Sequence, residues 1–476
     1  MSGTANLAGS AVINPINTGF ATPGSKEVTI LSSAGGTIDS GLDLIFQESA
    51  VIEYKLLFPN PTDVVLGTSI DFSPAGLNQN EAAIGEAINA INLAGGSTSF
   101  APVVAEIFKL PELQSLASAY DQLNPNIYDI TTATSFNNTL QYMRTLQDRM
   151  RGIRESGITS RIGLQSGLML DNYSSLLAYN GSNASLGQLL ETGQHQHPPS
   201  RYGVWIDGFG YWRNQSAEPG YTGFDSNMAG ISLGLDFLID EKMIAGISSG
   251  YSHTDIDLDN NRGEGDIDSP FVSLYGSYFA KDFYLDTILY YARQRYSNNR
   301  NIIFGSIHDA PQSDHTGDAY SAFLGGGYNY KIDQWGLQPY ASLQYIYLKE
   351  SAFDETGADG MNLTVRDRST DGLYSQLGLR LARRYQFETG SFMPEMKVAW
   401  SHDFDIDDRL INSSFSGTPG SAFVFRGQDV SKDAATLGAG ITYALTNGLS
   451  AAVRYSADLS EDYTNQSVHG EIRYAF

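Results

Sequence analysis

The sequence contains no cysteine among its 476 residues. This absence excludes disulfide frameworks, thiolate metal sites and cysteine nucleophiles. Cations are also scarce, because 29 Lys and Arg residues stand against 53 Asp and Glu residues, for a formal net charge of −24. Nucleic acid and anionic lipid both require a basic face on a protein that binds them. We therefore expect neither as a partner of this chain.

Long apolar runs are absent as well. No stretch of about 18 apolar residues occurs, so a transmembrane helix is excluded. A transmembrane β-barrel is not excluded, because its strands alternate apolar and polar residues and average to mild hydropathy. The N-terminus also lacks a cationic stretch followed by an apolar core, the pattern of a secretory signal. The protein is therefore either cytoplasmic or a fragment that begins downstream of its signal.

Three compositional zones follow one another along the chain. Residues 1–74 are rich in Ser, Thr, Gly and Asn, with short aliphatic segments between Gly and Pro residues, which predicts short strands. Residues 78–156 repeat their apolar positions at three and four, which predicts helices, the last of them over Phe136–Arg154. Residues 157–200 are mixed and polar, and we expect a loop or linker there.

From Arg201 to Phe476 the apolar period is two, in twelve alternating segments. Short turns alternate with long loops rich in Asp, Asn, Gly and Ser, one of them over Asp255–Ile267. An outer-membrane barrel has tight periplasmic turns and long external loops. Hydrocarbon offers no hydrogen-bond partners, so only a closed barrel satisfies every strand. We predict such a barrel; the alternative is a soluble twelve-stranded barrel or sandwich with an apolar interior.

Charged residues also occupy the alternate positions of these segments that are expected to point into the lumen, which we call the inward phase. They are Asp207, Arg380, Glu395, Lys397, Arg454, Glu471 and Arg473. A helix inside the lumen needs polar partners on the wall. These groups are expected to pair with each other or with linker residues such as Arg149, Arg151 and Glu155. The alternative is that they line a wet channel.

An ordered set of motifs resembles the type Va autotransporters of Gram-negative bacteria. Residues 202–210 resemble the family's barrel entry, G-x-W-x-x-G-F-G, and residues 234–236 and 246–252 resemble its second and third strands. The end, Ile472–Phe476, resembles the family's final aromatic strand. Upstream, residues 77–83 and 123–128 resemble the segments that join passenger and barrel.

This resemblance implies an all-β membrane protein: a 12-stranded antiparallel outer-membrane β-barrel with an α-helical linker or plug and an N-terminal right-handed parallel β-helix fragment. Residues 1–74 would be the C-terminal stub of a β-helix passenger, similar to an autochaperone. Residues 75–200 would be the helical linker and pore segment, in which Phe136–Arg154 or part of 157–200 plugs the pore. Residues 201–476 would be the translocator domain.

The resemblance further implies a translocator that anchors its passenger and exports it to the cell surface by type V secretion. Its partners would be the outer-membrane lipid bilayer, the β-barrel assembly machinery, periplasmic chaperones and its own passenger, and the chain would be a monomer. The family's terminal strand is an assembly signal, here carried by Val468, Ile472, Tyr474 and Phe476. The alternatives are a passive porin-like channel, or a surface adhesin whose binding activity lies in the passenger. A porin has no use for the amphipathic segment 78–157.

Catalytic and metal-binding motifs are weak. Some autotransporters cut themselves at an Asn-Asn bond, and Asn137-Asn138 lies in the third helical run. An ordinary helical pair explains these residues better, so we expect no enzyme. His195 and His197 are two histidines in an expected flexible loop without a fence of carboxylates, and Asp255–Asn261 lacks the central glycine and the closing glutamate of a calcium loop. No metal and no cofactor are therefore predicted.

Overall fold

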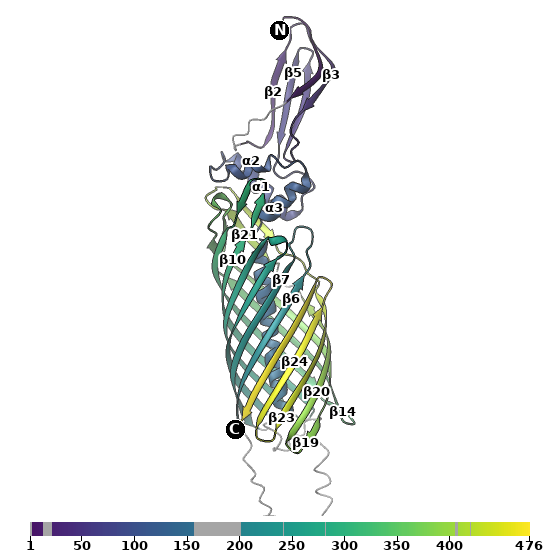
Figure 1. Cartoon of the computed structure of the whole chain (residues 1–476), viewed down its shortest axis with the longest axis vertical. Helices are drawn as coiled ribbons and strands as arrows, with labels where there is room; N and C mark the ends of the chain where they lie inside the picture. Colours follow the sequence, from purple (N-terminus) through teal and green to yellow (C-terminus); the bar gives the residue numbers. More distant parts are fainter. Residues whose placement is uncertain are drawn as a thin grey trace, which may run out of the picture.

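Twelve long antiparallel strands form a closed barrel in the computed structural model, which describes residues 2–12, 21–156, 201–240, 242–280, 282–404, 408–418 and 420–476 (Figure 1). The strands are β6 (Tyr202–Gln215), β7 (Phe224–Asp240), β8 (Met243–Leu258), β9 (Gly263–Phe279), β10 (Phe283–Arg300), β13 (Gln312–Tyr328), β15 (Trp335–Glu350), β18 (Arg368–Arg383), β20 (Gly390–Asp403), β23 (Asp433–Leu445), β24 (Leu449–Leu459) and β25 (Tyr463–Ala475). Two short strands, β14 (Tyr330–Ile332) and β19 (Tyr385–Phe387), lengthen the turns next to β15 and β20.

The barrel closes between its first and last strands. β25 pairs with β6 from Tyr463 opposite Gln215 to Ala475 opposite Gly203. The backbone N–H of Phe476 also donates to the carbonyl of Tyr202 at 3.0 Å. Each long strand therefore has a neighbour on both sides, which is the condition for crossing hydrocarbon without an unpaired edge.

The two faces of each strand differ in polarity, as β7 illustrates. Ile231, Leu233 and Leu235 point outward and are 50%, 57% and 46% exposed, whereas Ser232 and Asp236 between and beside them are buried in the lumen. Exposed aliphatic side chains of this size recur on every long strand. This outward apolar band matches the alternation that a membrane barrel requires. Among the described residues, no helix is long and apolar enough to cross a membrane.

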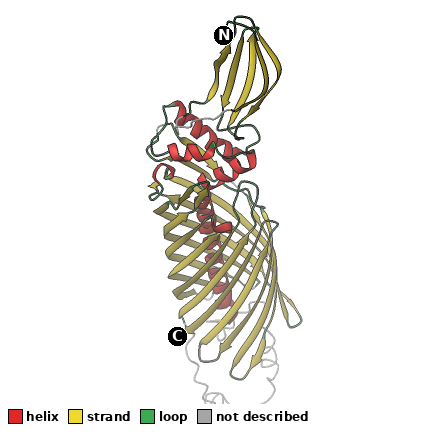
Figure 2. Cartoon of the chain, turned by 45° about the horizontal axis from the view of Figure 1, so that its top comes forward, coloured by secondary structure: helices red, strands yellow, loops and turns green. Residues whose placement is uncertain are grey.

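Four helices follow the N-terminal strands in the described residues that precede the barrel. They are α1 (Gln79–Leu93), α2 (Ala101–Ile107), α3 (Leu113–Leu123) and α4 (Asn126–Ser156). A capping box starts α1, because the Asn78 side chain accepts from the Glu81 N–H at 2.9 Å and Glu81 accepts from the Asn78 N–H at 2.8 Å. Figure 2 shows α4 running inside the barrel, with α1–α3 above its mouth. At 1.5 Å per residue, the 31 residues of α4 extend about 46 Å.

The long loops carry structure of their own at the end of the barrel that faces α1–α3. Their elements are β11 (Ile302–Phe304), β12 (Ile307–Asp309), β16 (Phe353–Asp354), β17 (Leu363–Val365), β21 (Leu410–Phe415), β22 (Ala422–Arg426), and the 3-10 turns η1 (Asp259–Asn261) and η2 (Asp359–Met361). β16, β17, β21 and β22 form one small sheet from two different loops. The segment Asp255–Ile267, predicted as a loop, is mostly strand, because β8 and β9 continue beyond the apolar band.

The N-terminal part is a small group of strands at the tip of the molecule (Figure 1). It consists of β1 (Ala5–Val12), β2 (Gly24–Ser32), β3 (Thr37–Ile45), β4 (Ile52–Asn60) and β5 (Asp63–Ile70). β1 and β3 pair in parallel, as rungs of a parallel β-helix do, but β2, β5 and β4 pair antiparallel. The predicted right-handed parallel β-helix fragment is therefore not confirmed.

Candidate functional site: the barrel lumen and its helix

Helix α4 is held in the lumen by apolar contacts along one side. Tyr142 packs against Phe271 of β9 with ring centroids 4.1 Å apart, and also against Phe209 and Tyr290. The Tyr142 hydroxyl lies 2.9 Å from Ser248 Oγ of β8, so its polar atom is also satisfied. The helix therefore packs mainly against the wall formed by β6, β9 and β10.

The upper half of α4 is held by hydrogen bonds of its polar side chains and by one ion pair. Thr132 Oγ1 donates to Glu350 of β15 at 2.8 Å, and Asn138 Nδ2 donates to Thr254 of β8 at 2.8 Å. At the mouth, Asp129 in the first turn accepts from Arg409 Nε at 2.7 Å. An acidic residue there also suits the positive end of the helix dipole. These contacts orient the helix about its axis.

The lower half carries four arginines that reach different strands. Arg144 Nη1 lies 2.6 Å from Asp458 Oδ2 of β24, and Arg154 Nη1 lies 2.5 Å from Asp286 Oδ1 of β10. Arg149 pairs with Asp236 of β7 and with Glu471 of β25 at 2.8 Å. Arg151 pairs with Glu395 of β20 at 2.9 Å. We call these four arginines the arginine ladder. Removing one partner from a buried pair leaves the other charge buried and unpaired, which costs about 3–5 kcal/mol of stability. An axial shift of α4 would separate all of these pairs, so the ladder selects one register.

The structure places the charged residues predicted for the inward phase inside the barrel. Asp207, Arg380, Glu395, Arg454, Glu471 and Arg473 are all buried, and Lys397 is half-buried. Their partners belong both to the wall and to the helix.

Glu395 is the centre of the wall network. It accepts from Arg380 Nε at 3.0 Å, from Arg454 Nε at 2.9 Å and from Arg151 of α4 at 2.9 Å. Three guanidinium groups around one carboxylate keep it ionised and fix its position. Glu471 accepts a hydrogen bond from Arg149, one of the linker residues for which a wall partner was predicted. The side chain of Glu155, another of those linker residues, lies outside the described residues.

Four wall residues that the predicted set of lumenal partners did not include are equally involved. They are Asp236, Asp286, Asp458 and His469. His469 lies between Asp148 of α4, at 2.8 Å, and Asp207 of β6, at 3.4 Å. The inward phase of β7, β10, β24 and β25 was the signal that could have identified all four.

A cavity of about 130 Å³ lies between α4 and the wall that includes β15 and β18. Its lining mixes polar side chains, among them Asn137, Gln344 and Gln376, with apolar ones such as Phe136 and Phe323. The helix therefore leaves space on this side of the lumen.

The Asn137-Asn138 pair lies within the continuous turns of α4. Asn137 Nδ2 donates to the Ala133 carbonyl at 2.9 Å, and Asn138 Nδ2 donates to Thr254. Both side-chain amides are therefore held in hydrogen bonds that point away from their own carbonyl carbons. The histidines His195 and His197 lie outside the described residues.

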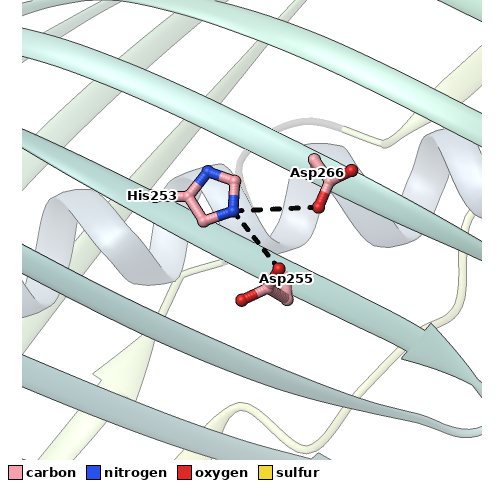
Figure 3. Close-up of side chains that lie close together, drawn as sticks. All are labelled: His253, Asp255 and Asp266. Atoms are coloured by element: carbon pink, nitrogen blue, oxygen red, sulfur yellow. Dashed lines mark hydrogen bonds and ion pairs between the residues drawn. The ribbon is translucent and has the colours of Figure 1, made fainter.

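One group of three possible metal ligands occurs among the described residues. His253, Asp255 and Asp266 offer atoms within 4.8 Å of one another on the outer face of β8 and β9 (Figure 3). His253 already pairs with Asp268 at 2.9 Å and with Asp255 at 3.2 Å. All three side chains are solvent-accessible, so we assign no metal to them.

Comparisons with known proteins place this barrel in a family. The sequence model of the autotransporter beta-domain matches residues 204–456, more than half of the chain. Extracellular serine protease from Serratia marcescens is 24% identical over 274 residues, which cover 58% of this chain and 26% of the relative. Outer membrane protein A from Rickettsia conorii is 23% identical over 291 residues, 58% of this chain and 14% of the relative. The chain thus spans about a quarter or less of the length of these two relatives.

Two solved structures align with the barrel. The translocator domain of the autotransporter NalP from Neisseria meningitidis aligns with a TM-score of 0.48 and 18% identity, covering 61% of this chain and 93% of that domain. The beta domain of the Bordetella autotransporter BrkA aligns with a TM-score of 0.45 and 21% identity, covering 58% of this chain and 100% of that domain.

Fold and lumen together define an outer-membrane β-barrel with a helix threaded through its pore. The family match is more specific: the chain belongs to the autotransporter family, and its barrel is the translocator domain for passenger export. The barrel therefore resides in the lipid bilayer of the outer membrane, with the passenger side at the cell surface.

Proposed function

We propose that the chain exports and anchors its own N-terminal passenger, and that α4 remains in the pore as its plug. The observation that supports this most directly is the arginine ladder, because Arg144, Arg149, Arg151 and Arg154 each meet a carboxylate on the wall. The seven predicted wall residues then act as the polar lining that receives the helix. A passive porin-like channel is not favoured, because helix α4 occupies the lumen of this barrel.

The proposed division of labour follows the three zones. Residues 1–74 are the passenger stub, 75–200 the linker and pore segment, and 201–476 the translocator. Passenger folding outside the cell supplies the direction of export, because a folded passenger cannot re-enter the pore. The chain as a whole is not an enzyme, and the name serine protease belongs to the relative that carries it.

Assembly depends on partners outside the chain. We propose that the β-barrel assembly machinery reads the outward face of β25 and that periplasmic chaperones deliver the unfolded precursor. Ile472, Tyr474 and Phe476 on that face are 55%, 48% and 59% exposed, so they are accessible to a partner or to lipid. Val468 completes the same alternating set. The assembled protein is a monomer.

The test is single-channel conductance in a planar bilayer. The whole chain should be nearly closed, and a chain lacking residues 78–200 should conduct strongly. A deletion of residues 2–74 is the matched control, because it leaves α1–α4 in place and should stay closed. Equal conductance of all three chains would contradict the plug.

A second variant tests the contribution of α4 independently of α1–α3. Replacing the four ladder arginines with glutamine keeps every helix but removes its charged contacts with the wall. We expect intermittent opening, since α4 loses its fixed register. Conductance that is unchanged from the whole chain would mean that the arginines do not hold the plug.

A further inference from the structure

A single apolar core joins the passenger side of the chain to the outer loops of the barrel. Half of its buried residues come from residues 51–130 and half from the barrel strands and loops. The first group includes Phe72, Ile88, Phe100, Ile107 and Tyr120; the second includes Phe304, Phe353, Leu363, Phe415 and Phe425. We call α1–α3 the cap, and β11, β12, β16, β17, β21, β22 and η2 the platform.

Polar contacts fix the cap on the platform at several points. Asn80 of α1 donates from Nδ2 to the Arg426 carbonyl at 3.0 Å and accepts from the Arg426 N–H at 2.9 Å. Its amide thereby satisfies both backbone groups at the end of β22. On the other side, Gln122 of α3 accepts from the Ile303 N–H at 2.6 Å, and Glu106 of α2 accepts from Ser306 at 2.7 Å.

The fit between cap and platform is close in the middle of the interface. The rings of Phe100 and Phe415 have centroids 4.8 Å apart. A Cβ added at Gly360 of the platform would lie 2.7 Å from the Ser99 carbonyl carbon, so only glycine allows this approach. Packing of this density resembles a domain interior rather than a transient contact.

Neither half is expected to be stable without the other. The cap helices have 15, 7 and 11 residues, and isolated helices shorter than about 12–15 residues are marginal in water. The platform sheet has four very short strands drawn from separate loops, and its apolar face is covered by the cap. Both halves therefore depend on their shared core.

We propose that the platform is a docking surface that holds the cap, and the passenger stub joined to it, without a covalent link. The residues before a cut within the cap then stay on the barrel, although the cut removes their covalent link to α4. This inference rests on the proposed function in one respect, because it takes the residues before α4 to be the exported side.

The test cuts the chain at a position that spares the core. Gly95, between α1 and α2, is exposed and has a φ of 103°, so the glycine is kept and a specific protease site is inserted after it. The full chain carries an epitope tag at its N-terminus and is cut on intact cells. We expect nearly all of the tagged fragment, residues 1–95, to remain with the cells after cleavage. Quantitative release of this fragment would overturn the proposal.

A matched pair of variants locates the holding surface on β22. Phe425 is 1% exposed and lies in the core, whereas its neighbour Val424 is 47% exposed on the opposite face. Phe425→Asp should increase release after cleavage at least tenfold, and Val424→Asp should leave it unchanged. Equal retention in both variants would overturn the assignment of the platform.

Two further readouts keep the outcomes separate. Surface labelling of the tag before cleavage reports export, so a failure of the proposed function appears as an unlabelled tag rather than as release. Heat-modifiable migration reports barrel assembly. Where Phe425→Asp does not assemble, Asn80→Ala replaces it, because it changes the cap alone and removes both bonds to Arg426. Release from Asn80→Ala no faster than from the parent would then count against the platform.

Discussion

Arg144 of α4 and Asp458 of β24 lie 314 residues apart in the chain, yet their side chains meet at 2.6 Å inside the barrel. Asp458 also accepts from Thr436 of the neighbouring strand at 2.7 Å. The pair is nearly enclosed, with side-chain exposures of 18% and 5%. It therefore links the pore helix to the wall where water screens the charges little.

This pair predicts a charge-swap result. Arg144→Gln leaves the Asp458 carboxylate without its cation and should lower the free energy of unfolding by about 3–5 kcal/mol, the usual penalty for a stranded buried charge. Arg144→Asp combined with Asp458→Arg should recover a good part of that loss, because the pair is restored with its direction reversed. Unfolding of the purified chain in detergent measures both effects.

The control for the swap is Lys26→Gln, which removes an exposed cation from β2 and should change stability little. If Arg144→Gln were as stable as this control, the pair would contribute nothing to holding α4.

The buried carboxyl of Asp121 in α3 leads us to predict that mild acid stabilises the cap. Burial and, to a lesser extent, nearby Glu81 raise the pKa of its carboxyl and Arg262 opposes them, with the net result that the pKa is raised to about 6. Because the folded state binds this proton more tightly than the unfolded chain, stability rises as the pH falls through 6 and levels off near the ordinary value of 3.8. Asp121→Asn should stabilise the cap at pH 7 by on the order of 1–2 kcal/mol and abolish this dependence.

The urea concentration at which the cap becomes protease-sensitive measures this effect at pH 7 and pH 5. Asp43→Asn is the control, since Asp43 is exposed on β3 far from the core. A cap that becomes less resistant at pH 5 in the parent chain, or a pH effect that persists in Asp121→Asn, would show that another group dominates.

The barrel was predictable because hydrocarbon and lumen impose opposite demands on alternate residues of each strand. The same phase placed Glu395, Arg454 and Glu471 on the inner wall. Helix periodicity likewise predicted α1 and α4, but not where each would lie, because nothing in an amphipathic pattern distinguishes a lumen from a surface.

The outer ends of β8 and β9 and the core shared by cap and platform escaped prediction for physical reasons. Above the apolar band the strand pattern inverts: Ile256 and Ile267 point inward into the shared core, while Asp255 and Asp266 point outward into water. Outward polarity made β8 and β9 look like loop. The cap core is also assembled from many short pieces far apart in the chain, so no local pattern reveals it.

The hydrogen bonds of Asn137 and Asn138 lead us to predict that the chain does not cleave itself between these two residues. Self-cleavage requires the asparagine amide to attack its own backbone carbonyl. Both amides instead donate within the helix or to Thr254, so Asn137→Ala, which removes the amide that would cut the 137–138 bond, should leave the migration of the chain unchanged. Mass spectrometry of protein purified from cells that make the intact precursor gives the answer. A fragment ending at Asn137 in the parent chain, absent in Asn137→Ala, would refute this prediction.

The absence of cysteine makes the register of α4 directly measurable by disulfide trapping. Asn138 and Thr254 are in hydrogen-bond contact at 2.8 Å, so Asn138→Cys with Thr254→Cys should oxidise rapidly to a single cross-linked species. Asn137→Cys with Thr254→Cys is the matched control, because Asn137 lines the cavity on the other side of the helix. Adding the four arginine-to-glutamine changes should lower the yield of the first cross-link severalfold, since one turn of slippage moves residue 138 by about 5.4 Å. A yield that is insensitive to the arginines would show that the aromatic contacts of Tyr142 hold the register by themselves.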